Sequence, residues 1–203
     1  MPLSHAIRRL FFLAAMTTAL GGCTTLRSPD WPVKEAVPGE PVTIEMAIGD
    51  LTAEIVGLDA SIHPLEAHRI ADTALRLTHS KIDEWQVTRP PLVNNMLINS
   101  GMRPRGLCIH WTEDLLKALD ALDLETVDLY WVVAKRSRFR IEHSSVVITA
   151  KHQVFPEGLV LDGWRNSGML YWVRVTNDKY QWKMFDRVTG EYVTQAEVID
   201  AIR

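Results

Sequence analysis

The sequence is poor in cysteine: its 203 residues contain only two, Cys23 and Cys108. Two thiols cannot build a disulfide scaffold or a four-cysteine zinc site, so they could at most pair with each other. The chain also lacks a block of Lys and Arg, and its formal net charge is −3. No nucleic-acid partner is therefore expected, because proteins that bind nucleic acids carry a basic patch or stripe. A chain of this length suits one ordinary domain.

The amino-terminal segment lacks a hydrophobic run long enough to cross a bilayer. A short basic stretch with Arg8 and Arg9 precedes the apolar residues 10–20, whereas a spanning helix needs about 20 apolar residues. A basic stretch followed by a short apolar one is typical of a secretory signal peptide. An ordinary secretory signal with a chance cysteine after it is one interpretation of this segment.

The residues LGGC at positions 20–23 also resemble a bacterial lipobox, which has an apolar and two small residues before a cysteine. The resemblance implies cleavage after residue 22, diacylglyceryl attachment to Cys23 and acylation of its new amino group. Three acyl chains, at about 0.8 kcal/mol per buried methylene, would anchor the chain in a membrane. The residue after the cysteine is Thr24 and not Asp, which resembles the outer-membrane sorting signal of lipoproteins in bacteria with two membranes. We expect a lipid-anchored protein of the bacterial cell envelope that faces the periplasm.

Loss of residues 1–22 removes two arginines and no acid, which leaves 20 Lys and Arg against 25 Asp and Glu, a net charge of −5. Residues 23–41 contain four prolines and are typical of a tether, which leaves residues 42–203 as one domain. If Cys23 carries lipid, Cys108 is the only thiol of an exported domain, where a lone thiol is a liability. Such a thiol is expected to have a use.

The domain predicts helices first and strands second. Loose alternation over residues 42–48 favours an edge strand. Apolar residues at helical spacing predict a helix from Pro64 that ends before Pro90, and a short helix over residues 92–98. A further helix begins with Cys108 in its first turn. Its apolar stripe comprises Trp111, Leu115, Leu116, Leu119 and Leu122.

Beyond residue 123 the composition changes to that of strands. Strands are predicted at residues 127–133, 139–150, 159–164, 169–175 and 180–185. Thr194 and Glu197 form a capping-box pattern that predicts a final helix through residue 202. The fold class is therefore α+β, with helices packed on an antiparallel meander.

Three residues along this layout could cooperate chemically. The first turn of a helix favours the thiolate of Cys108, because free N–H groups and the macrodipole favour negative charge, and Gly106 allows a tight entry. Alternation along residues 139–147 turns His143 inward with Ser145, and Asp162 ends an apolar run where an acid is out of place. His143 and Asp162 would be directly opposite only if the turn lay between residues 152 and 153. The turn signals at residues 156–158 come later, so a bulge or irregular loop must absorb the difference.

The residues GLC at 106–108, a strand histidine and then LD at 161–162 are similar to the transglutaminase-like branch of papain-like thiol enzymes, over roughly residues 90–175. The resemblance implies that Cys108 is the nucleophile, His143 the general base and acid, and Asp162 the residue that orients His143. It also implies an oxyanion hole made by the Cys108 N–H and an upstream donor. Candidates for that donor are Asn94, Asn95 and Trp111. The chain differs from many relatives by the serines at 144–145 and by Gly-Trp after Asp162.

The first functional hypothesis is an envelope-anchored thiol enzyme that acts on amide bonds of cell-wall peptides or proteins, by hydrolysis or acyl transfer through a thioester on Cys108, without a cofactor. The second is a non-catalytic lipoprotein that uses the same fold as a binding or assembly module. Two further interpretations of the residues stay open. Cys108 could be an inert core residue, and His110, His143 and His152 could hold zinc.

Overall fold

The computed structural model describes residues 42–136, 141–186 and 189–193. The predicted signal peptide, lipidated Cys23, tether and final helix lie outside these residues. The elements in chain order are α1 (Ile44–Val56), α2 (Pro64–Glu84), α3 (Pro91–Asn99), α4 (Cys108–Asp120), β1 (Val127–Arg136), β2 (Ile141–Ala150), the 3₁₀ helix η1 (Phe155–Glu157), β3 (Leu159–Asp162), β4 (Tyr171–Arg174), the 3₁₀ helix η2 (Val175–Asn177), β5 (Lys183–Phe185) and β6 (Tyr192–Val193).

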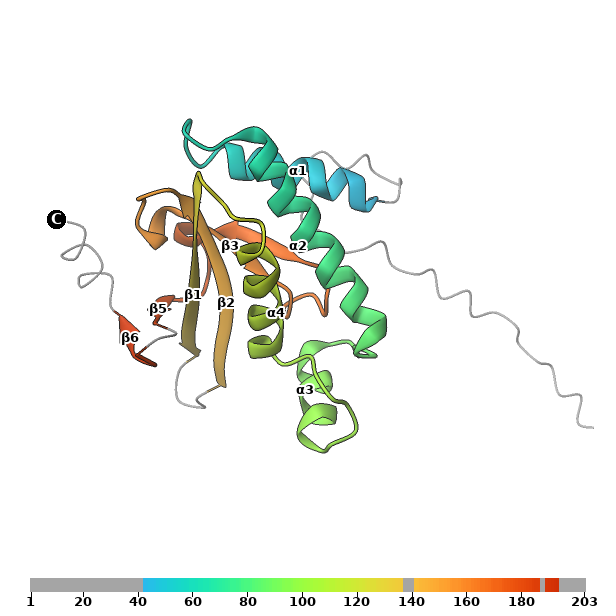
Figure 1. Ribbon diagram of the computed structural model, residues 1–203. Coiled ribbons are helices and arrows are strands. Elements are labelled where there is room, and N and C mark those ends of the chain that lie inside the picture. Colours follow the sequence, from blue (N-terminus) through green and yellow to red (C-terminus); the bar gives the residue numbers. More distant parts are fainter. Residues whose placement is uncertain (1–41, 137–140, 187–188, 194–203) are drawn as a thin grey trace, which may run out of the picture.

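The helices α1, α2 and α4 form a layer on one side of a six-stranded antiparallel sheet (Figure 1). The strand order is β4-β3-β2-β1-β5-β6. The strands β1 to β4 form the expected meander, but β5 pairs with the free side of β1, so the chain crosses from one edge of the sheet to the other. The α+β class and the antiparallel sheet are confirmed.

The two faces of β2 have different neighbours, because successive side chains of a strand point to opposite faces. Val146 and Ile148 pack in the main core with the helices. Val147 belongs to a second, smaller cluster on the other face, together with Val132 and Trp182. His143 shares its parity with Val147, so it lies on the face that the helices do not cover.

The edge strand expected at residues 42–48 is wrong, since this segment begins α1. The Thr43 hydroxyl caps the helix by accepting a hydrogen bond from the Met46 N–H at 3.2 Å. Ala47, Leu51 and Ile55 are buried on one helical face. A window of seven residues is too short to separate loose alternation from the helical period, which only the residues after 48 reveal.

The other helices agree with the sequence. The helix α2 begins at Pro64 and ends before Pro90, and α4 begins at Cys108 with its apolar stripe buried against α2 and the sheet. It ends at Asp120, so Leu122 lies just beyond it. Within the described ranges, no helix is both long and apolar enough to cross a membrane.

Candidate functional site

Cys108 is the first residue of α4, and its thiol is free and partly exposed. Its S–H points at the main-chain carbonyl oxygen of Glu142 on β2, with 3.7 Å between sulfur and oxygen. The chain enters the helix through Gly106, which has a φ of +120°. A Cβ at this position would lie 2.5 Å from the side-chain nitrogen of Asn94. Glycine is therefore required both for the backbone conformation and for the close approach.

The peptide before Cys108 is fixed by hydrogen bonds on both sides. The Asn94 amide and the Trp111 indole N–H both donate to the Gly106 carbonyl, at 3.4 and 3.1 Å. His110 Nδ1 accepts from the main-chain N–H groups of Gly106 and Leu107, at 3.1 and 3.3 Å. Burial, and then the charge of Arg105, lower the pKa of His110, which suits a neutral ring that accepts hydrogen bonds. These side chains hold the loop that presents the thiol.

His143 and Asp162 form a buried pair, with 2.6 Å between Nε2 and Oδ2 and exposed side-chain fractions of 3% and 1%. Val146 of β2 pairs with Leu161 of β3, so the same register puts Ser145 opposite Asp162. His143 lies two residues further along the same face, which makes it a diagonal neighbour of Asp162. The irregular connection with η1 gives this register, and the long histidine side chain covers the remaining offset.

The pair has the electrostatics of a charged couple. Burial lowers the pKa of His143, but the Asp162 carboxylate and then the Cys108 side chain raise it, and the resulting pKa is about 9. Burial raises the pKa of Asp162, but His143 and then Arg165 hold it below its usual value. Nε2 is used by Asp162, and Nδ1 is buried with no hydrogen-bond partner among the described residues. Nδ1 is therefore the nitrogen left to exchange a proton with the Cys108 thiol.

Sequence reasoning missed two charged residues of the site, Arg165 and Asp178. The Arg165 side chain donates to Asp162 Oδ2 at 2.7 Å and binds Asp178 with its other two nitrogens. The main-chain N–H groups of Trp164 and Arg165 donate to Asp162 Oδ1, at 2.9 and 3.1 Å. Asp162 thus opens a tight turn, and the arginine three residues after it was the signal available in the sequence.

Aromatic rings surround His143. Trp164, Tyr180 and Trp182 have ring centroids 4.9, 4.9 and 5.5 Å from that of the imidazole. Asn95, one of the expected oxyanion donors, accepts a hydrogen bond from Trp164 Nε1 at 3.0 Å. The rings thus shield the His143–Asp162 pair from water, which strengthens its electrostatic interaction.

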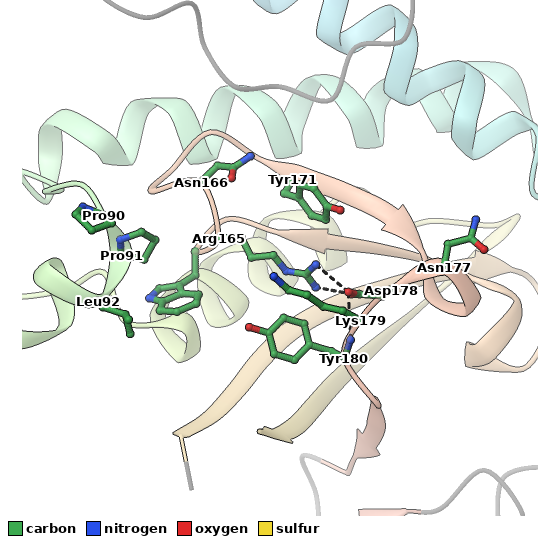
Figure 2. Close-up of a pocket in the computed structure, with 11 residues that line it drawn as sticks. Pro90, Pro91, Leu92, Arg165, Asn166, Tyr171, Asn177, Asp178, Lys179 and Tyr180 are labelled. Carbon is green, nitrogen blue, oxygen red and sulfur yellow. Dashed lines mark hydrogen bonds and ion pairs between the residues drawn. The ribbon is translucent and has the colours of Figure 1, made fainter. Parts of the chain in front are cut away.

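A hollow of about 430 Å³ adjoins the site (Figure 2). Trp164 and Tyr180 line it and also pack on His143, so these two rings separate the hollow from the imidazole. Tyr171 is a further wall, and the start of α3 closes another side with Pro91 and Leu92.

The described residues contain no group of three His, Cys, Asp or Glu side chains placed to hold a metal ion. The arrangement of Cys108, His143 and Asp162 instead suits proton transfer and nucleophilic attack by sulfur, because the imidazole can take the thiol proton while the carboxylate stabilises the imidazolium.

Comparison of the chain with protein-family models, curated proteins and solved structures gave no significant match.

Proposed function

We propose that the protein is a thiol enzyme with a papain-like, transglutaminase-like fold that acts on amide bonds through Cys108. The observation that carries the proposal is a partly exposed thiol at a helix amino terminus, beside a buried His143–Asp162 pair whose Nδ1 has no other partner. An inert core cysteine would need neither the buried pair nor the exposure. Free N–H groups at the helix start and a nearby imidazolium both favour the thiolate.

The reaction would proceed in two balanced steps. The Cys108 thiolate attacks the amide carbonyl, a C–S bond forms, and the C–N bond breaks as His143 donates its Nδ1 proton to the departing amine. In the second step His143 takes a proton from water or from an acceptor amine, which attacks the thioester. The C–S bond then breaks and the thiolate is regenerated.

The negative oxygen of the tetrahedral intermediates needs N–H donors. The Cys108 main-chain N–H suits this role, because the first N–H groups of a helix have no partner within it. Asn95 is the better second donor among the three expected residues, since Asn94 and Trp111 donate to the Gly106 carbonyl. The hollow beyond Trp164 offers room for groups that flank the amide in a cell-wall peptide or a protein.

Alkylation of Cys108 by iodoacetamide across pH tests the proposal. In the detergent-solubilised full-length protein, with Cys108→Ala as the blank, we expect a midpoint below the value of about 8.5 that is usual for thiols. His143→Ala should move the midpoint up to about 8.5 and slow the reaction at pH 6 to 7 by roughly tenfold or more. His152→Ala, which removes an exposed histidine at the far end of β2, is the matched control. An ordinary midpoint that does not respond to His143→Ala would favour the binding-module hypothesis instead.

The proposed location is the cell envelope, with the chain anchored through lipid on Cys23. Incorporation of labelled palmitate into the native chain, and its loss in Cys23→Ser, would support the anchor. A secreted chain cleaved at residue 22 that takes up no label would contradict it. Release of ammonia from protein amides, compared with incorporation of a labelled primary amine, separates hydrolysis from acyl transfer.

A further inference from the structure

Arg165 joins Asp162 to a second buried carboxylate. Its Nε donates to Asp162 Oδ2 at 2.7 Å, the same oxygen that accepts from His143 Nε2. Its Nη1 donates to Asp178 Oδ1 at 2.9 Å, and its Nη2 binds the other oxygen of Asp178, as Figure 2 draws. The exposed side-chain fractions are 9% for Arg165 and 1% for each carboxylate. The guanidinium therefore has one orientation, set by two carboxylates.

Asp178 is itself held in place. The Trp182 indole N–H donates to its Oδ2 at 2.9 Å, and the main-chain N–H of Tyr180 donates to its Oδ1 at 3.3 Å. The guanidinium also lies over the rings of Tyr171, Tyr180 and Trp182, at 4.7, 4.6 and 5.7 Å from their centroids. Two of these rings also pack on the imidazole of His143. The cluster thus links a loop after β4 rigidly to the His143–Asp162 pair.

We propose that Arg165, held by Asp178, is a positioning residue that fixes the Asp162 carboxylate and, through it, the imidazole of His143 beside Cys108. This inference rests on the proposed function. A buried ion pair is seldom more stabilising than an apolar pair of the same shape, so stability alone accounts poorly for it. Geometry accounts for it better, because a carboxylate that could rotate would lose either the His143 bond or its two main-chain donors.

A positioning role and a purely electrostatic role predict opposite shifts. As a nearby cation, Arg165 would disfavour the imidazolium, so its removal would raise the pKa of His143 above about 9. As a positioning residue, Arg165 keeps Asp162 in place, so its removal would weaken the His143–Asp162 bond and lower the pKa of His143. The direction of the shift therefore separates the two roles.

The experiment follows the His143 ring protons by NMR across pH in the full-length protein, compared with Arg165→Met, Arg165→Lys and Lys179→Met. For Arg165→Met we expect the pKa of His143 to fall by about one unit or more, and Cys108 alkylation at pH 7 to slow several-fold. Arg165→Lys keeps the charge, but a lysine cannot bind two carboxylates at once, so the pKa of His143 should fall by a similar amount in this variant. Lys179→Met is the charge control, because it removes a cation that lies over the Tyr180 ring. The pKa of His143 should not fall in this variant.

A rise in the pKa of His143 in Arg165→Met would overturn the inference. So would a pKa of His143 and a Cys108 alkylation rate in Arg165→Lys that equal those of the native protein. If Arg165→Met does not fold, Asp178→Asn serves in its place. Asp178→Asn weakens the bonds that hold Arg165 and leaves Asp162 unchanged. It should lower the pKa of His143 by a smaller amount. Failure of the proposed function would instead appear as a Cys108 alkylation rate that is unchanged by His143→Ala in the otherwise native protein. The two failures are therefore distinguishable.

Discussion

Glu66 and Asp162 are both buried carboxylates, but they end in different surroundings. Glu66, in the first turn of α2, accepts hydrogen bonds from the main-chain N–H groups of Glu125 and Thr126, at 2.5 and 2.8 Å, and from the Thr126 hydroxyl. Burial raises the pKa of Glu66, but these donors outweigh it and the pKa is lowered. This carboxylate ties the segment before β1 to α2, and the connection ends at a main-chain group, the His63 N–H that donates to the Thr126 hydroxyl oxygen at 3.1 Å.

Asp162 takes part in four hydrogen bonds, one more than Glu66, and two of them involve titratable or charged side chains. His143 and Arg165 share one of its oxygens. The other ring nitrogen of His143, Nδ1, has no hydrogen-bond partner among the described residues and is the atom available to Cys108. The comparison teaches that burial, short hydrogen bonds and a lowered pKa do not mark a functional carboxylate. The mark is a hydrogen-bonded chain that reaches an unsatisfied, titratable atom near a nucleophile.

Asp162→Asn should give the largest effect. It removes the charge between His143 and Arg165, which leaves His143 without a charged partner and Arg165 with Asp178 alone, so we expect the free energy of unfolding to fall by about 3–5 kcal/mol. Alkylation of Cys108 at pH 7 should slow by roughly tenfold or more, because the imidazolium loses its counter-charge. Urea unfolding and iodoacetamide kinetics measure the two effects. Loss of stability with native alkylation would make Asp162 structural, like Glu66.

The pH dependence of stability should distinguish the two regions next. The pKa of His143 is raised from 6.5 to about 9 in the folded chain, so its contribution is complete below pH 6.5 and is lost as the pH rises through 9. The contribution is about 3 kcal/mol, from about 1.4 kcal/mol per pKa unit. Glu66 adds nothing in this window, because its lowered pKa acts only at acid pH. Unfolding free energies from pH 6 to 10 should slope downward in the native chain and become flat in His143→Ala.

The Asp162 side of this contrast could be predicted in part from the sequence, because it depends on local patterns, whereas the burial of Glu66 could not. The strand alternation predicts that His143 points inward, and Gly106 before an apolar stripe predicts that Cys108 lies in the first turn of a helix. The partnership of Arg165 with Asp178 could not be predicted, because it depends on how the turn after β3 meets the loop after η2. The edge strand at residues 42–48 failed for a related reason, since a short window does not show which face the core will cover.

Glu66→Gln should have a smaller effect than Asp162→Asn. The amide keeps the shape but loses the charge that three donors stabilise, so we expect the free energy of unfolding to fall by about 1–3 kcal/mol. Cys108 alkylation should stay at the native rate, because none of the hydrogen bonds of Glu66 leads to His143 among the described residues. Thr126→Val, which removes one of the donors, should give part of the same loss. Slower alkylation in Glu66→Gln would break the distinction between the two carboxylates.

Asn95→Leu should give the smallest effect on stability and the most informative one on catalysis. The Trp164 indole loses its acceptor, which costs about 1 kcal/mol, and alkylation should slow by less than about threefold, because two other rings still pack on His143. Asn99→Leu, at the exposed end of the same helix, is the control. Alkylation forms no oxyanion, whereas amide cleavage does. A loss of amide cleavage on the order of a hundredfold with near-native alkylation would therefore identify Asn95 as an oxyanion donor, whereas equal small losses would limit it to holding Trp164.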